Sequence, residues 1–166
     1  MEQHDVAEVL NRPLSQELLG RDHARLAFVA QDGTPRNIPV GFCWNGSEIV
    51  VCTSKNARKL AMLARRPAVA FTIDTEEFPP KILSVRGNAE LDPVDGIPDE
   101  YLQVSKTMSM TPEQRAEWEV NVRALYTDGM VRIVIRPTWA KLTDFETTLP
   151  DNVAELVRRQ AAAQQA

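Results

Sequence analysis

The 166-residue sequence lacks a long apolar segment, and it also lacks the features of an export signal. No apolar run approaches the ~18 residues that a membrane-spanning helix requires. The first ten residues, MEQHDVAEVL, are acidic where a signal peptide would be basic and then strongly apolar. We therefore predict a cytoplasmic protein with no membrane partner.

Histidine and cysteine are both scarce, with two of each in the chain. The spacing of Cys43 and Cys52 is not that of a metal site, and only His4 and His23 are available as imidazole ligands. We therefore expect no metal centre.

The two cysteines are expected on neighbouring strands that are joined by a tight turn at Asn45-Gly46. If this turn pairs Trp44 with Ser47, Cys52 lies four residues beyond the position opposite Cys43, about 13 Å away at strand spacing. A disulfide cannot span that distance. Two buried, reduced thiols are the expectation.

Common catalytic and phosphate-binding motifs are also missing. The chain contains no G-x-S-x-G, no G-x-G-x-x-G and no P-loop, and no histidine lies near a candidate nucleophile. Adjacent carboxylates at Glu76-Glu77 and Asp99-Glu100 fall in expected loops, where neighbouring side chains point apart. We name no catalytic residue, so demanding chemistry would have to come from a cofactor.

What is present is the composition of an ordinary globular domain. Hydrophobic residues make up 43% and charged residues 25% of the sequence, with a net charge of −4. An acidic protein is poorly suited to general nucleic-acid binding. A local basic cluster in such a chain favours a small anionic ligand over a polyanion.

Strand and turn signals dominate the middle of the chain. Segments rich in Val, Ile, Phe and Thr alternate with turn signals, of which Asp32-Gly33 and Asn45-Gly46 predict hairpins. We expect six strands that form a small β-barrel, the first three of them as an antiparallel meander. Pro39 predicts an edge, a bulge or a ligand-facing stretch in its strand. The expected strands are 23–31, 36–45, 48–54, 68–75, 81–91 and 130–145.

Helices are expected on both sides of the strand region. Two short pieces broken at Pro13 precede it, a mid-chain helix spans about 56–65, and a helical insertion comes before the last strand. In that insertion Thr111 and Gln114 form a capping box. The following helix carries an apolar face that consists of Trp118, Val122 and Leu125.

The stretch TSKNARKLAMLARRP, which begins at Thr53, places cations at the start of the mid-chain helix. A helix start carries about half a positive charge, so Lys55, Arg58 and Lys59 each cost about 0.3–1 kcal/mol unless an anion compensates. The expected N-cap is Ser54 or Asn56. A phosphate would suit the N–H groups, the hydroxyl and the arginine fork, whereas a solvated basic face is the competing interpretation.

The order of these parts resembles the pyridoxamine 5′-phosphate oxidase-like family of flavin-binding split β-barrels. The resemblance runs from about Ala24 to Phe145. It implies a mainly β protein with helices, built as a six-stranded antiparallel split β-barrel with a mid-chain helix and a helical insertion before the last strand. The matching stretches are Arg36-Asn37-Ile38-Pro39, Thr53-Ser54, Asn56-Ala57-Arg58-Lys59 and Arg65-Arg66-Pro67-Ala68-Val69.

The resemblance also implies roles for individual residues. Arg36, Arg58 and Lys59 would face the flavin phosphate, with Lys55 in the same cluster and Thr53 and Ser54 bonding nearby. The flavin ring would be bordered by backbone of Asn37, Ile38, Pro39 and Val40. Trp139 would either reach the flavin of a partner subunit or pack in the core. The domains implied are N-terminal helices at 1–22, the flavin-binding barrel at 23–149 and a helical tail at 150–166.

Two departures from the family pattern concern the substrate. Family members that oxidise pyridoxamine phosphate carry a lysine where this chain has Gly41. They also carry an R-x-H motif near the carboxyl end, whereas no histidine follows His23. We therefore expect a different substrate.

The function implied by the resemblance is a homodimeric, FMN-dependent oxidoreductase whose 95–128 insertion shapes the substrate pocket. A compact cation cluster favours the phosphate monoester of FMN over 8-hydroxy-5-deazaflavin (coenzyme F-420), although Arg65 and Arg66 would suit the longer acidic tail of the deazaflavin. A non-enzymatic flavin- or haem-binding module is the third possibility, although no haem ligand is evident.

Overall fold

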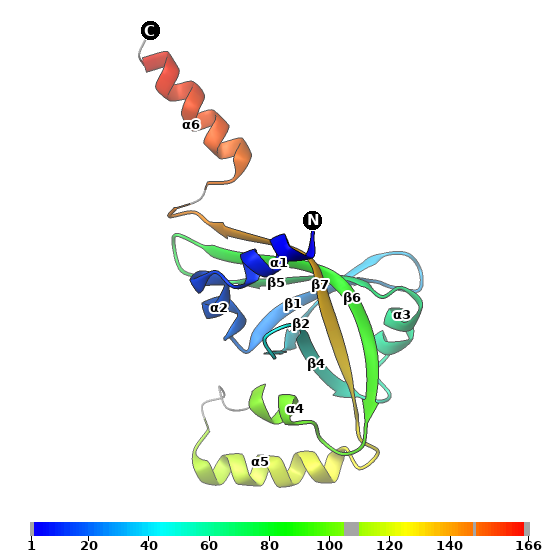
Figure 1. The fold of residues 1–166 in the computed structure, drawn as a ribbon. Helices are drawn as coiled ribbons and strands as arrows, with labels where there is room; N and C mark the ends of the chain where they lie inside the picture. The colour runs from blue at the N-terminus through cyan, green and yellow to red at the C-terminus, as the bar shows by residue number, and fades with distance from the viewer. Residues whose placement is uncertain (1, 105–109, 148, 165–166) are drawn as a thin grey trace.

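The computed structural model describes residues 2–104, 110–147 and 149–164. Within them, seven strands form one antiparallel sheet that is not closed, and six helices accompany it (Figure 1). The strands are β1 His23–Val29, β2 Pro35–Gly41, β3 Cys43–Trp44, β4 Ile49–Ser54, β5 Ala68–Asp74, β6 Lys81–Val94 and β7 Met130–Asp144. The helices are α1 Gln3–Leu10, α2 Pro13–Leu19, α3 Lys59–Arg65, α4 Asp99–Val104, α5 Pro112–Leu125 and α6 Asp151–Gln164.

The sheet runs in the order β2-β1-β5-β6-β7-β4-β3, so one expected strand is in fact two. The segment 36–45 leaves strand geometry at Phe42, and its halves lie at opposite edges of the sheet. The break is stabilised because the Phe42 side chain is buried against Phe71, edge to face at 5.2 Å. The expectation of six strands is therefore wrong by one.

The expected three-stranded meander forms only in part. The first half of the segment 36–45 pairs with β1 and its second half pairs with β4, but no ladder joins β2 to β4 within the described residues. β4 also pairs with β7, from Ile49 opposite Ile135 to Ser54 opposite Met130. The apolar residues of β4 thus gain a long partner strand in the middle of the sheet, which the short-range turn signals did not indicate.

The Asp32-Gly33 hairpin is confirmed as the connection between β1 and β2. Gly33 has a φ of 83°, a value that favours glycine, and Asp32 accepts hydrogen bonds from Thr34. β2 pairs with β1 alone among the described strands, so the first of the three possibilities for Pro39, an edge strand, is confirmed.

The turn at Asn45-Gly46 also connects two strands, but with a different register. Trp44 lies opposite Ile49, so Cys43 faces Val50 and not Glu48. The loop holds four residues because Asn45 Oδ1 accepts the N–H groups of Ser47 and Glu48. Cys52 is therefore two residues beyond the position opposite Cys43, not four. Both cysteines keep their thiols, and both are only half-buried, not buried as expected.

The core is one cluster of buried side chains that come from the strands, from the N-terminal helices and from α3. Fully buried side chains on the strands include Leu26, Phe71, Leu83 and Ile133. α1 and α2, the two pieces expected on either side of Pro13, add the buried residues Val6, Val9, Leu10, Leu18 and Leu19 to the same cluster. Each such side chain contributes roughly 1.5–3 kcal/mol through burial, so the amino-terminal helices are part of the structural core.

Among the remaining helices, α3 adds the fully buried Leu63 to this core, whereas α4, α5 and α6 add none of their described residues to it. α5 begins with the expected capping box of Thr111 and Gln114, and it carries Val122 buried and Trp118 half-buried. Leu125 is 71% exposed, so its predicted place on the packed face is wrong. Figure 1 shows α6 extending away from the sheet. Residues 105–109 of the expected insertion and 165–166 of the expected tail lie outside the described residues.

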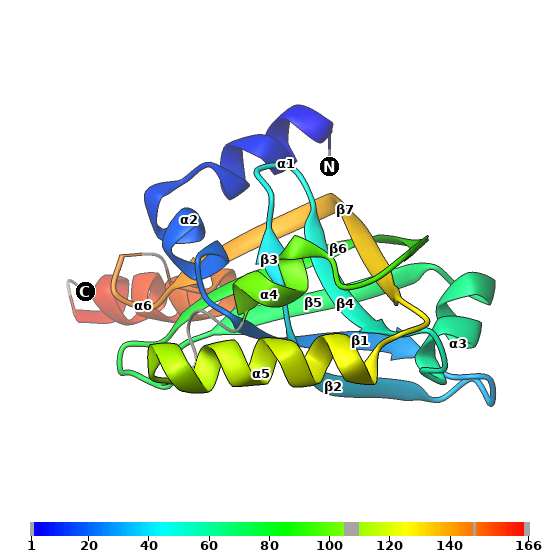
Figure 2. The same cartoon turned by 90° about the horizontal axis from the view of Figure 1, so that it is seen from below.

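The insertion is held against one end of the sheet. α4 packs on β3 and β4, and Figure 1 shows α5 below it, at the end of the molecule opposite α1. Figure 2 views the molecule from the α5 side. In the part of the chain that the structure describes, no helix is long and apolar enough to cross a membrane.

Candidate functional site

The junction between β4 and α3 brings together two of the predicted site residues. Thr53 is the second-to-last residue of β4, and it is 9% exposed. The half-buried Lys59 begins α3, and its Nζ donates a hydrogen bond to Thr53 Oγ1 at 2.9 Å. The strand and the helix therefore present a hydroxyl and an ammonium group at one point.

The ammonium group of Lys59 has no carboxylate to balance it among the described residues. Burial lowers the pKa of Lys59, and no neighbouring charge contributes to the shift. Desolvating a cation is costly unless an anion faces it. A phosphate bound at this point would therefore offset the desolvation cost of the Lys59 ammonium group.

The helix itself begins later than expected. Arg58, not Ser54 or Asn56, occupies the N-cap position, and no side chain caps the helix. Residues 55–58 form successive turns because Ala57 N–H bonds to Ser54 O and Leu60 N–H to Ala57 O. Ser54 stays in β4, opposite Met130.

Arg58 lines a hollow of about 460 Å³ between α3 and the end of β1. Figure 2 shows α3 beside the β1–β2 turn at this end of the molecule. We call this space the arginine hollow, since Arg65 and Arg66 line it as well. Arg66 donates to Ala30 O at 2.7 Å, which fixes it across the hollow. The other lining residues are Val29, Ala30, Gln31, Ala61 and Met62.

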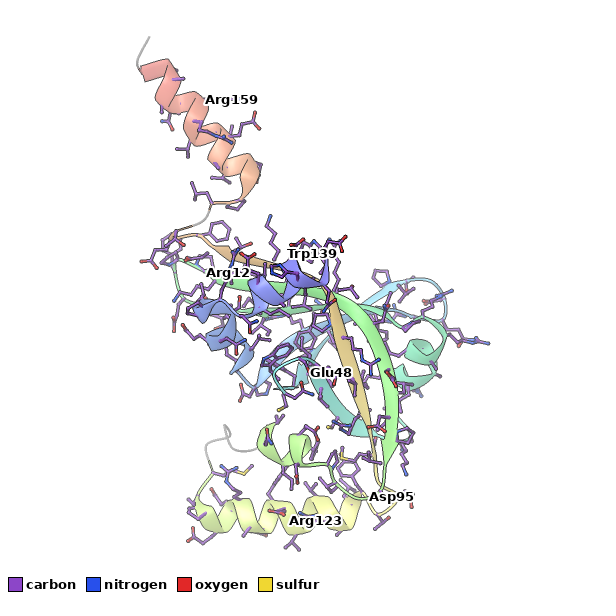
Figure 3. The ribbon with its side chains drawn as sticks, in the orientation of Figure 1. Arg12, Glu48, Asp95, Arg123, Trp139 and Arg159 are labelled. Carbon is purple, nitrogen blue, oxygen red and sulfur yellow. The ribbon has the colours of Figure 1, made fainter. Side chains whose placement is uncertain are left out.

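Unlike Lys59, two other cations that were predicted to belong to the site form ion pairs with carboxylates. Arg36 forms an ion pair with Asp32 at 3.2 Å, within the β1–β2 turn. Lys55 lies 3.8 Å from Asp95, which Figure 3 labels near the loop that follows β6. Both pairs are exposed, and such pairs contribute little stability, so either cation can exchange its partner at low cost. Their predicted roles stay predictions.

The residues predicted to border a flavin ring follow the edge strand β2. Asn37 and Pro39 are exposed, Ile38 is half-buried against the core, and Val40 is buried. This alternation is that of a strand with one face on the core. Because β2 is an edge strand among the described residues, backbone groups on its unpaired side can meet a ligand or a partner, which the predicted role requires.

Sequence reasoning missed a charged network beneath the insertion. Arg132 on β7 donates to Asp92 Oδ2 at 2.6 Å and, through Nε and Nη2, to Glu100 of α4. Glu100 was expected in a solvated loop, but it is largely buried by this contact. The long-range pair could not be recognised from the adjacent acids Asp99-Glu100 alone.

Trp139 lies on β7 in a half-buried position, labelled in Figure 3. The guanidinium of Arg86 lies 4.3 Å from the centre of its ring, a cation–π contact on the outer side of the sheet. One face of the indole is thus covered within this chain.

Comparisons with known proteins agree with this architecture. The sequence profile of the pyridoxamine 5′-phosphate oxidase family matches residues 13–129, more than half of the chain. No curated protein matches the sequence. A solved F420 reductase is 27% identical, with a TM-score of 0.57 and coverage of 76% of this chain and 94% of its own.

Two more distant solved structures share the fold. The haem storage protein HutZ from Vibrio cholerae is 20% identical, with a TM-score of 0.55 and coverage of 80% of this chain and 93% of its own. General stress protein 26 from Bacillus anthracis is 14% identical, with a TM-score of 0.54 and coverage of 78% and 89%. The extent of the profile match decides the assignment: the chain belongs to the pyridoxamine 5′-phosphate oxidase family.

Proposed function

We propose that this protein is a flavin-dependent oxidoreductase that binds the phosphate of FMN at Thr53, Arg58 and Lys59, between two subunits of a homodimer. The observation that carries the proposal is the half-buried ammonium of Lys59, which lacks a carboxylate partner within the described residues. A phosphate oxygen would satisfy that charge, and the exposed guanidinium of Arg58 at the helix start would add a second charge-assisted contact.

The protein would bind and orient the cofactor, and the flavin would supply hydride or electron transfer when bound. Backbone of the edge strand β2 would border the ring, as predicted for residues 37–40. The dimer fits the same edge, because an exposed strand edge is commonly covered by a partner.

The test is a titration of the purified, flavin-free chain with FMN, followed by flavin fluorescence. Arg58→Glu removes one attraction to the phosphate and adds a repulsion, so we expect at least a 100-fold rise in Kd. Arg158→Glu makes the same charge reversal on α6 and serves as the matched control, with an expected change under twofold. An unchanged Kd for Arg58→Glu, or a purified protein that carries haem, would contradict the proposal.

A deazaflavin cofactor is the second candidate, and the arginine hollow is the observation that favours it. Arg65 and Arg66 extend the positive surface beyond Arg58, where a cofactor with an acidic tail would lie. The 27% identity to an F420 reductase points the same way. FMN, whose phosphate lies close to the ring, needs only the compact cluster at the helix start.

The two cofactors can be separated by parallel titrations. Arg65→Ala should leave the Kd for FMN within twofold, since the monoester does not reach that side chain. Tenfold tighter binding of coenzyme F-420 than of FMN, reduced at least fivefold by Arg65→Ala, would make the deazaflavin the cofactor.

A further inference from the structure

A second cavity lies between the sheet and the insertion, apart from the arginine hollow. Its volume is about 220 Å³. We call it the insertion pocket, and its walls come from β1, β2 and β4 on one side and from α4 and α5 on the other. The lining residues are His23, Gly41, Val50, Cys52, Glu100, Tyr101, Val104 and Trp118.

The aromatic wall of this pocket is rigidly built. The rings of Tyr101 and Trp118 are stacked, with centroids 5.9 Å apart and planes at 15°. Tyr126 meets Tyr101 edge to face at 5.9 Å from behind. Stacked and edge-to-face rings support one another, so they form a preformed surface for a further flat ring.

The charge of the pocket is nearly neutral. None of its eight lining residues is Lys or Arg. The carboxylate of Glu100 is balanced by Arg132 behind it, and His23 lies 2.9 Å from Asp22. Burial raises the pKa of Cys52 to about 12 and that of Tyr101 to about 12, so both stay uncharged at neutral pH. An anionic ligand would find no lysine or arginine among the lining residues to replace its lost hydration.

The size of the pocket limits its occupant to a small molecule. A dry apolar cavity of about 150 Å³ accommodates benzene. A volume of about 220 Å³ therefore accommodates one ring with substituents or two fused rings. At Gly41 a Cβ atom would lie only 2.7 Å from Val104 Cγ1, so a side chain at this position would occupy the pocket.

We propose that the insertion pocket binds uncharged aromatic molecules of one or two fused rings, and that the substrate of the enzyme belongs to this class. The substrate role rests on the proposed function, because Gly41 directly follows the β2 residues predicted to border the flavin ring. The binding itself does not depend on the flavin.

The test is isothermal titration calorimetry of the full chain with indole and with 3-indoxyl phosphate, each in the absence and presence of FMN. Indole should bind once per chain, and the phosphate ester at least tenfold more weakly. Equal affinities, or no saturable binding of indole, would overturn the proposal.

Matched variants locate the ligand. Val104→Phe fills the pocket from α4 and should abolish indole binding. Val120→Phe makes the same change on α5 at a residue 67% exposed, and should leave it unchanged. Trp118→Leu removes part of the aromatic wall without adding bulk and should weaken binding at least fivefold. Retained affinity in both pocket variants would overturn the proposal.

The two proposals fail separately. Indole binding by a chain that never binds flavin would contradict the proposed function and the substrate role, and would leave the binding site itself supported. Flavin binding without indole binding would contradict the pocket alone. Circular dichroism and thermal unfolding of each variant show whether a loss of affinity reflects a loss of fold.

Discussion

Lys59 Nζ lies 2.9 Å from Thr53 Oγ1, and this hydrogen bond joins the first residue of α3 to the end of β4. The contact places a half-buried cation where its only described partner is a neutral hydroxyl. Stability and ligand affinity therefore make opposite demands on this residue.

Lys59→Met should separate these demands. The flavin-free variant should be as stable as the wild type or more so, because the desolvation of the ammonium group is removed while the aliphatic part of the side chain is kept. Its affinity for FMN should fall about 10- to 100-fold, the loss of a charge-assisted contact of about 1.5–3 kcal/mol. Urea unfolding and FMN titration measure the two effects. Lys141→Met, at an exposed position on β7, is the control and should change neither.

The pH dependence of stability gives an independent measure of the same group. Burial lowers the pKa of Lys59 below its usual 10.5, so the unfolded chain binds more protons between the lowered value and 10.5. The cost of the buried charge is fully present below that window and disappears above it. The free energy of unfolding should therefore rise with pH through the window in the wild type, relative to Lys59→Met. Parallel pH profiles for the two proteins would contradict the interpretation.

Arg132 and Arg136 allow a matched test of burial. Each lies on β7 and contacts two carboxylates, but the side chain of Arg132 is 25% exposed and that of Arg136 is 64% exposed. Arg132→Met should destabilise the fold by about 1–3 kcal/mol, because Glu100 is left partly buried without its cation. Arg136→Met should have a smaller effect, because Arg136 and its partner Glu90 are both more than 60% exposed and only its other partner, Glu48, is partly buried. Hydrogen exchange should rise in α4 in the first variant only.

Cys52 should be chemically inert in the folded protein. Burial, reinforced by Glu100, raises the pKa of its thiol to about 12, so the thiolate fraction at pH 8 is on the order of one in ten thousand. In a Cys43→Ser background, Ellman's reagent should label no thiol in the native state and one thiol in urea. Fast native labelling would show that α4 does not cover this residue.

The proposed dimer is testable by sedimentation. With FMN bound at micromolar protein concentration, we expect a species of twice the 18.6 kDa chain mass. A monomer that still holds FMN would show that the site is complete within one chain.

Local signals in the sequence predicted the parts of the fold that depend on neighbouring residues. The capping box at Thr111 and Gln114, the glycine turn at Gly33 and the edge position of Pro39 all follow from steric and hydrogen-bonding rules over a few residues. The break at Phe42 was not predictable in this way. It depends on contact with Phe71, which lies far away in the sequence.

In the candidate site, too, local features could be predicted from the sequence and long-range contacts could not. The cations at the helix start were visible in the sequence, and so was the absence of compensating acids. The partner of Lys55 was not, because Asp95 reaches Lys55 only after β6 has paired with the rest of the sheet. The insertion pocket likewise arises from residues on β1, β2, β4, α4 and α5 that no sequence pattern groups together.

The pairing of β4 with β7 has a kinetic consequence. The residues opposite one another in this ladder are more than 70 positions apart in the chain, further than in the other ladders of the sheet. Closing so long a loop is entropically slow, so the β1–β2 and β5–β6 hairpins should form before β4 docks. Thr53 would then reach its place in the last ordered segment, and a bound phosphate would mainly slow unfolding and leave the rate of folding unchanged.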